Sequence, residues 1–365
     1  MSDLHIVFRV DASVYIGVGH LYRCLTLAEE YRNLGATIHF ICRNHQGNIN
    51  QQIKRKGYKV YELPLSKKHN FQQNLKGYDK WLGSTQDIDA SETIEVLINR
   101  KIDWLIVDHY AIDCQWEVKL RPYAKKIMVI DDMANRKHSC DILLDQTYLR
   151  KQRDYRGLVP RSCKLLLGTE FALLRPEFAL YRKKALQFRE EHYGINNVLV
   201  AMGGMDDENI TSKILDAIAL LESNISITVT VVLAAGAPHL QNIKKNLHKY
   251  IFPINIFSNV SNMAELMLNA DLAIGAGGTT SWERCCLGLP TILIVLSENQ
   301  NKIGENLANI GAVITLHKNN KIEEAVSQSI NTLIKDNKKY IDMSHIAAEV
   351  CDGNGTKRTV KQMMN

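Results

Sequence analysis

Residues 5–42 read HIVFRVDASVYIGVGHLYRCLTLAEEYRNLGATIHFIC, which contains a strand, a helix and a second strand in succession. The two apolar runs, residues 5–10 and 37–42, are rich in Val and Ile. Between them an amphipathic stretch begins at Leu21 and ends at Gly35, the residue type expected just past a helix C-terminus. This order predicts a parallel sheet that is covered by helices on both faces.

The same alternation continues along the chain on both sides of a charged connecting helix expected at residues 176–193. Before this helix, further apolar runs occupy residues 58–63, 103–108, 126–131 and 141–145. After it, the runs are residues 196–204, 226–235, 254–257, 271–278, 290–296 and 311–316. The sequence therefore predicts an α/β protein with two Rossmann-like, doubly wound parallel-sheet domains facing a cleft, residues 1–172 and 173–365.

Two segments near the end of the chain fall outside this alternation. Residues 318–341 are rich in Lys and Asn, so we expect a solvated helix and loop there. A last helix is expected at about residues 341–363, and it could pack on either domain.

Composition excludes several classes of protein. With 365 residues, 45% hydrophobic and 23% charged, the chain is neither disordered nor fibrous, and no apolar run reaches membrane-spanning length. The net charge of +6 comes from scattered Lys and Arg, which argues against nucleic acid as a partner and suits a small anionic ligand. The eight Cys contain no CxxC pair, and the N-terminus does not read as a signal peptide. We therefore expect a cytoplasmic protein with reduced thiols and no stable membrane insertion. We also expect it to be a monomer.

A glycine turn follows the first strand and leads into a helix. Gly17 and Gly19 allow a sharp turn, and the N–H groups of a helix that begins near His20 could bind an anion. His20 at this position is the candidate general base, because a helix N-terminus favours neutral imidazole. For Arg9 and Asp11, an internal ion pair and contact with a ligand are equally compatible with the sequence.

Polar side chains also follow the next predicted strands of the first domain. Neighbouring residues on a strand point to opposite faces, so we expect Asp131 and Asp132 to form a cap or a sugar contact rather than a metal site. Candidate sugar contacts at these strand ends are Asp108, His109, Tyr110, Asp132 and Gln146.

The second domain carries two glycine loops of its own. Gly203 and Gly204 follow one strand, and GAGGTTSWERCCLGLP (275–290) follows another. In the second loop Gly277, Gly278, Thr279, Thr280 and Ser281 present backbone N–H groups and hydroxyls to a phosphate. Glu283 is placed one turn into the helix, where it could accept hydrogen bonds from a ribose or simply offset the helix dipole. Asn299 and Gln300 follow the next strand as further polar candidates.

Taken together, these strings resemble a known family. The stretch NVSNMAELMLNADLAIGAGGTTSWERCCLGLP, followed by SENQ, is similar to the nucleotide-binding domain of GT-B-fold enzymes of the MurG type. The strings FRVDASVYIGVGHLYRCLTLA, LIVDHYAIDCQWE, VIDDMANRKHSCDILLDQ, GTEFALLRPEF and VAMGGMDDENIT resemble the PseG-type UDP-sugar hydrolases of pseudaminic acid biosynthesis.

The resemblance implies hydrolysis of UDP-2,4-diacetamido-2,4,6-trideoxy-β-L-altropyranose to UDP and the free sugar. It implies water activation by His20, inversion at C1, and no metal or other cofactor. It also implies Glu283 on the ribose, residues 277–281 on the phosphates and the main chain near Val260 on the uracil.

Two other functions are compatible with the same residues. One is a MurG-like glycosyltransferase that uses a UDP-amino sugar, and the other is a nucleotide-sugar-binding protein without catalysis. An oxidoreductase is excluded because position 22, where a dinucleotide fingerprint has its third glycine, is Tyr.

Overall fold

The computed structural model describes residues 4–65, 77–192, 194–222 and 225–364. The chain divides into two compact units. Unit 1 comprises Met1–Leu173 together with Gly355–Asn365, and unit 2 comprises Leu174–Asn354. The first division lies one residue after the predicted one, and the end of the chain belongs to unit 1.

Unit 1 is built on a sheet of seven parallel strands in the order β3-β2-β1-β4-β5-β6-β7. The strands are β1 (His5–Val10), β2 (Thr37–Arg43), β3 (Lys59–Leu63), β4 (Trp104–Asp108), β5 (Lys126–Ile130), β6 (Ile142–Asp145) and β7 (Lys164–Leu167). The sequence predicted the first six and missed β7, whose four residues, KLLL, are too few to show a period.

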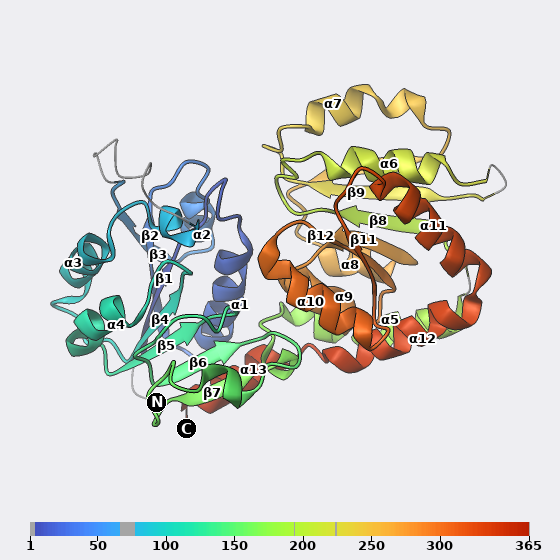
Figure 1. Cartoon of the computed structure of the whole chain (residues 1–365). Coiled ribbons are helices and arrows are strands. Elements are labelled where there is room, and N and C mark those ends of the chain that lie inside the picture. Colours follow the sequence, from blue (N-terminus) through green and yellow to red (C-terminus); the bar gives the residue numbers. More distant parts are fainter. Residues whose placement is uncertain (1–3, 66–76, 193, 223–224, 365) are drawn as a thin grey trace. The chain divides into compact units, whose positions relative to one another are not determined.

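Helices cover both faces of this sheet, as alternation along β1 requires (Figure 1). Ile6, Phe8 and Val10 pack in one cluster with residues of α1 (Gly19–Asn33) and α13 (Gly355–Met364). Val7 points to the opposite face and packs in a second cluster with α3 (Gln86–Leu97) and α4 (Cys114–Leu120). The remaining short helices of unit 1 are α2 (Asn50–Arg55), η1 (Gly77–Leu82), η2 (Arg121–Tyr123), η3 (Gln152–Tyr155) and η4 (Thr169–Phe171).

Unit 2 has six parallel strands in the order β10-β9-β8-β11-β12-β13. They are β8 (Asn197–Ala201), β9 (Thr228–Leu233), β10 (Ile254–Ser258), β11 (Leu272–Ala276), β12 (Thr291–Val295) and β13 (Ile314–His317). The helices are α5 (Pro176–Glu191), α6 (Ile210–Ala219), α7 (Leu240–Lys245), η5 (Leu247–Lys249), α8 (Met263–Leu268), α9 (Thr279–Cys286), α10 (Glu298–Asn309), α11 (Ile322–Lys335) and α12 (Asn337–Val350). All six strands were predicted.

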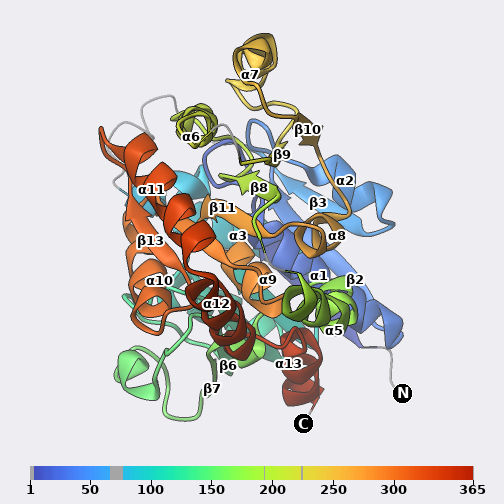
Figure 2. The ribbon, with the colours of Figure 1, turned by 90° about the vertical axis from the view of Figure 1, so that its right-hand side faces the viewer.

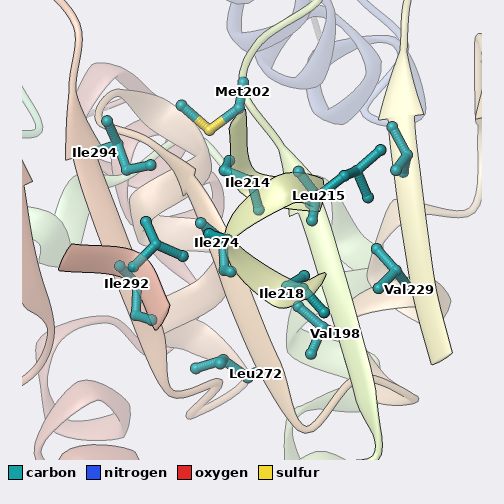
Figure 3. Close-up of a cluster of buried hydrophobic side chains, with 14 of the residues drawn as sticks. Val198, Met202, Ile214, Leu215, Ile218, Val229, Leu272, Ile274, Ile292 and Ile294 are labelled. Carbon is teal, nitrogen blue, oxygen red and sulfur yellow. The ribbon is translucent and has the colours of Figure 1, made fainter. Parts of the chain in front are cut away.

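The core of unit 2 forms where α6 covers one face of the sheet. Figure 3 shows Ile214, Leu215 and Ile218 of α6 lying against strand residues such as Val198 and Ile274. Elsewhere in the unit, α5, α9 and α12 pack against one another (Figure 2).

The prediction of a solvated helix within residues 318–341 is wrong for one side of that segment. Helix α11 packs on α6, and it buries Ile322, Val326, Ile330 and Leu333 in the core of unit 2. Most of the Lys and Asn residues that suggested solvation lie outside α11, in residues 318–321 before it and 337–339 at the start of α12.

The predicted last helix is interrupted. Residues 351–354 separate α12 from α13, and Gly353 adopts a φ of 81°, a left-handed conformation that a glycine reaches without strain. After this break, α13 packs on α1 and η4 of unit 1.

Each sheet has one switch point, where strand order reverses direction. In unit 1 it lies between β1 and β4, and in unit 2 between β8 and β11. Ligands of doubly wound sheets bind outside the carboxyl ends of the strands at this point. The predicted glycine turns follow three of these four strands, namely β1, β8 and β11.

Candidate functional site

The loop after β1 folds back on itself before α1 begins. The Ser13 side-chain oxygen accepts hydrogen bonds from the N–H groups of Tyr15 (3.1 Å) and Ile16 (2.9 Å), and Gly17 N–H donates to the Ser13 carbonyl (2.9 Å). Gly17 has a φ of 76°, so this turn requires a glycine there. Gly19 is already the first residue of α1, whose N-terminus has no side-chain cap. His20 therefore lies in the first turn of α1, directly after this loop.

His20 forms a short contact with the end of β4. Its Nδ1 lies 2.6 Å from Oδ1 of Asp108, and its side chain is 12% exposed. Burial alone would raise the pKa of Asp108, but the charges of Arg23 and His20 hold that pKa below its usual value. An ionised carboxylate only accepts hydrogen bonds, so Nδ1 of His20 carries the proton. Nε2 then has a lone pair, and it has no hydrogen-bond partner among the residues that the structure describes.

Arg23 holds this carboxylate from the second turn of α1. Its Nε donates to Oδ2 of Asp108 and its Nη2 to Oδ1, both at 2.6 Å, and its Nη1 donates to Asp132 at 2.5 Å. Such a two-pronged pair fixes the plane of the carboxylate as well as its position. Asp108 is therefore a partner of His20 and Arg23. Its side chain has no exposed surface, which differs from the predicted direct contact with a sugar.

Arg9 and Asp11 form the internal ion pair that was one of the two interpretations of the sequence. Arg9 Nη1 donates to Asp11 at 2.7 Å, and Arg9 Nη2 donates to Asp89 of α3 at 2.6 Å; all three side chains are fully buried. His109 joins this network, since its Nε2 lies 3.3 Å from Asp11 Oδ2 while its Nδ1 accepts from the N–H of Ala111. These buried groups connect the loops that follow β1 and β4 to α3.

Three aromatic rings gather beside His20. Tyr110 meets the imidazole edge-on with ring centroids 4.5 Å apart, and Trp81 of η1 does so at 5.9 Å. Trp81 stacks on Tyr110 at 5.7 Å, and Tyr78 lies 4.7 Å from Trp81 and 5.1 Å from Tyr110. We call Tyr78, Trp81 and Tyr110 the aromatic cluster.

Tyr110 itself is held on two sides. Its hydroxyl donates to Asp132 at 2.9 Å, and the guanidinium of Arg136 lies 5.7 Å from its ring centroid. Asp132 is therefore shared by Tyr110 and Arg23. Gln146, the last candidate of unit 1, is buried, and its Oε1 accepts from the N–H of Leu173; its contact with a sugar stays a prediction.

In unit 2, the glycine loop after β11 is packed on a buried arginine. A Cβ at Gly275 would lie 2.5 Å from Nη1 of Arg284 and 2.9 Å from the carbonyl oxygen of Ala201, so only glycine fits there. Arg284 Nη2 donates to the Ala276 carbonyl at 2.9 Å and to the Ser281 hydroxyl at 3.1 Å. Gly278, with a φ of 133°, precedes α9, whose N-terminus has no side-chain cap. The loop thus combines backbone N–H groups, the exposed Thr280 and a buried positive charge.

Glu283 lies one turn into α9 with its side chain 13% exposed. Burial raises the pKa of this carboxyl to about 7, although Arg175, 3.8 Å away, and Arg284 both act to lower it. Arg175 also pairs with Glu177 and donates to the Ser261 carbonyl. In its ionised form this mostly buried carboxyl, whose ion-pair partner Arg175 is 3.8 Å away, can accept hydrogen bonds from a ligand.

The other candidates of unit 2 lie on the loops that follow β8 and β10 or in the first turn of α10. Gly203 and Gly204 are exposed after β8, and Val260 is half-buried after β10. Gln300 packs on the glycine loop, because a Cβ at Gly277 would lie 3.0 Å from its Cβ. Its Oε1 accepts from the N–H of Leu296. Asn299 lies in α10, but its side chain is outside what the structure describes.

The described residues lack two features that other classes of protein have. They contain no group of three or more His, Cys, Asp or Glu side chains arranged to hold a metal ion. Nor does any helix among them combine the length and the apolar character that crossing a bilayer requires.

Sequence reasoning missed Arg23, Asp89, Tyr78 and Trp81. Arg23 had a usable signal, since it follows His20 by three residues and so lies on the same face of the helix. The other three come from segments without a recognisable motif, and only the fold brings them to the switch point of unit 1.

Comparison with known proteins identifies similar chains. Residues 197–363 match the family model of the glycosyltransferase family 28 C-terminal domain. The UDP-2,4-diacetamido-2,4,6-trideoxy-β-L-altropyranose hydrolase of Campylobacter jejuni is 30% identical over 316 residues, which cover 84% of this chain and 97% of the hydrolase. An uncharacterised protein of Methanocaldococcus jannaschii is 26% identical over 82% of this chain, and the match spans 57% of that protein's length.

A solved structure is similar in fold. The crystal structure of Acinetobacter baumannii MurG gives a TM-score of 0.67 at 16% identity and covers 99% of both chains. With its two parallel-sheet α/β units, the protein therefore has a GT-B-like fold.

Proposed function

Since the chain belongs to the family of the Campylobacter jejuni UDP-sugar hydrolase, we propose that it cleaves a UDP-sugar by attack of water at the anomeric carbon. The observation that carries this proposal is the contact between His20 and Asp108, which leaves Nε2 of His20 as a free base. The proposed substrate is UDP-2,4-diacetamido-2,4,6-trideoxy-β-L-altropyranose, and the products are UDP and the free sugar. The monomeric state and cytoplasmic location expected from the sequence remain predictions.

We assign the sugar end of the substrate to the switch point of unit 1. Nε2 of His20 removes a proton from a water molecule while the water oxygen bonds to C1 and UDP leaves. Asp108 stabilises the imidazolium that forms. Arg23 keeps Asp108 ionised and in place. UDP is a good leaving group, so the reaction does not depend on a second carboxyl acting as a proton donor. Arg9, Asp11, His109 and Gln146 support the loops in this mechanism.

We assign UDP to the switch point of unit 2. The diphosphate lies on the loop 277–281, where N–H groups of α9 and the charge of Arg284 stabilise the negative charge that grows as the C1–O bond breaks. Glu283 accepts hydrogen bonds from the ribose hydroxyls, Val260 lies at the uracil, and Gly203 and Gly204 allow close approach to the nucleotide.

The proposed function is tested by determining whether the C1–O bond or a P–O bond breaks. Hydrolysis in ¹⁸O-water is expected to place the label on C1 of the sugar and leave UDP unlabelled, because the base serves attack on carbon. NMR of the first product is expected to show inversion at C1, and the reaction is expected to proceed in EDTA. Label in UDP would mean attack at phosphorus, and UDP release only when an acceptor sugar is added would mean a transferase; either result overturns the proposal.

A second prediction concerns Glu283. Replacing it by Ala is expected to weaken UDP binding by about 1.5–3 kcal/mol, the value typical of hydrogen bonds to a charged group. Calorimetry with UDP and UMP checks it, and both should lose affinity equally because the contact is to the ribose. The matched control is Glu298→Ala, an exposed first-turn carboxylate on α10. Unchanged affinity in Glu283→Ala would make the carboxylate only a partner of the helix dipole.

The raised pKa of Glu283 gives this contact a pH dependence. Below about pH 7 the free protein holds the carboxyl protonated, so binding through the carboxylate must first release a proton. UDP affinity is therefore expected to fall as pH drops from 8 to 6. Glu283→Gln, which cannot titrate, separates this effect from the titration of the phosphates, because only the latter remains in that variant.

A further inference from the structure

Two of the three rings of the aromatic cluster, those of Tyr78 and Trp81, are more exposed than the rings of a core cluster would be, whereas Tyr110 is buried. The chain has four Trp residues, and Trp104, Trp116 and Trp282 are 4%, 0% and 2% exposed. Trp81, in contrast, is half-buried, as is Tyr78 beside it. A large aromatic ring held open to solvent next to a reactive group is typical of a ligand site, because apolar walls with a few polar groups are what such sites present.

The position of Trp81 is fixed by its neighbours. It stacks on Tyr110 with an interplanar angle of 21°, and Tyr110 is in turn held by its hydrogen bond to Asp132 and by Arg136 on its ring. Tyr78 meets Trp81 edge-on at 4.7 Å. Trp81 also meets His20 edge-on. A substituent of the sugar close to C1, the carbon attacked by the water that His20 activates, would therefore lie within reach of the indole. The cluster is therefore a rigid wall beside the base.

The chemistry of this wall differs from that of the rest of unit 1's switch point. Asp108, Asp132 and Arg23 supply charge there, whereas Tyr78 and Trp81 supply apolar surface. Trp81 adds one donor, since its indole N–H has no hydrogen-bond partner among the described residues. Apolar surface with one N–H suits a methyl group beside an amide carbonyl, which is the composition of an acetamido substituent or of a 6-deoxy carbon next to one.

We propose that Trp81, supported by Tyr78, is a specificity-determining residue that packs on the methyl groups of the sugar and selects acetamido and 6-deoxy sugars over hydroxylated ones. This inference rests on the proposed assignment of the sugar to unit 1. It concerns which sugar is accepted and leaves the attack by His20 and the hold on UDP unchanged.

The first test measures binding of the sugar alone. Methyl glycosides of 2-acetamido-2,6-dideoxyglucose and of glucose are titrated against the full chain while tryptophan fluorescence is followed. The acetamido-deoxy glycoside is expected to change the emission and glucose is not. Trp81→Phe should abolish the change, because the other three Trp are buried. This readout does not depend on hydrolysis, so it decides the inference even where the proposed reaction fails.

The second test measures selection during turnover. Trp81→Ala is expected to lower kcat/KM for the diacetamido-trideoxy substrate by about 10–100-fold, while the Kd of UDP stays within a factor of two. The preference over UDP-N-acetylglucosamine, which has a 6-hydroxyl, should shrink by about tenfold. Compared with Trp81→Ala, Trp81→Phe is expected to regain most of the kcat/KM for the diacetamido-trideoxy substrate and most of the preference for it. The control is Val118→Ser, which removes an exposed apolar side chain from α4 of the same unit.

Two results would overturn the inference. One is an equal loss of kcat/KM for both UDP-sugars in Trp81→Ala, which would give the ring a purely structural role. The other is a fluorescence response that persists in Trp81→Phe or that glucose produces equally well. Absence of UDP release from every UDP-sugar, combined with specific binding of the acetamido-deoxy glycoside, would refute the proposed reaction and retain the sugar subsite.

Discussion

Replacing His20 by Asn is expected to reduce kcat by about 10²–10⁴, the usual contribution of a general base, and to leave the Kd of UDP within a few-fold. The reason is that Nε2 of His20 serves the attacking water, whereas the proposed nucleotide contacts all come from unit 2. Asn can still donate to Asp108 from its amide, so the charge balance with Arg23 is retained while the basic nitrogen is lost. Single-turnover rates and calorimetry with UDP measure the two effects separately.

His39→Asn is the matched control for this variant. His39 lies on β2 of the same unit, where it is half-buried against Tyr61 and makes no contact with the aromatic cluster. Its replacement is expected to leave kcat unchanged. Near-normal turnover in His20→Asn would refute the role of His20, since His109, the other histidine after a central strand, is buried against Asp11 and cannot take over without rearrangement.

Replacing Asp108 by Asn is expected to reduce kcat by about 10²–10⁴ as well, by a different route. An amide at this position can donate its N–H to Nδ1 of His20, which would move the imidazole proton to Nε2 and remove the base, the effect seen when a catalytic triad loses its carboxylate. The change also leaves Arg23 without one of its two carboxylate partners, and breaking a buried ion pair costs about 3–5 kcal/mol of folding stability.

Activity and stability must therefore be separated in this variant. Asp103→Asn is the control, because Asp103 precedes the same strand at its opposite end, where it pairs with Lys125 and accepts from the N–H of His5. Urea unfolding is expected to show a loss of stability for Asp108→Asn, and assays well below its midpoint should still show the loss of kcat. Full kcat in folded Asp108→Asn would mean that the carboxylate serves only Arg23.

The fold was largely predictable from the sequence because parallel strands that are buried on both faces are continuous apolar runs. β7 was missed because four residues are too short to show a period. The buried face of α11 could have been found, since Ile322, Val326, Ile330 and Leu333 repeat at helical spacing; the Lys and Asn residues on both sides of the helix obscured it. The glycine at position 353 likewise marked the break between α12 and α13.

The site was less predictable, and the reason is distance along the chain. His20 could be chosen from its glycine turn, but its partner is 88 residues away. A carboxylate at a strand end looks the same in sequence whether it faces a ligand or an arginine. Asp108 was therefore expected at the sugar, and for Asp11 a ligand contact and an internal ion pair were both left open, whereas the fold pairs each of them with an arginine. Trp81 carries no motif at all, and only the sheet topology brings it to His20.

The division of the chain into two units has a consequence for biosynthesis. Unit 2 is one continuous stretch inserted between two parts of unit 1, and the ends of that insertion meet, because a Cβ on Gly355 would lie 2.3 Å from the carbonyl oxygen of Ala172. The ribosome must therefore make all of unit 2 before α13 emerges. Until then, α1, which carries His20, lacks the helix that packs beside it. During synthesis, unit 2 would thus be complete before unit 1, although unit 1 begins first in the sequence.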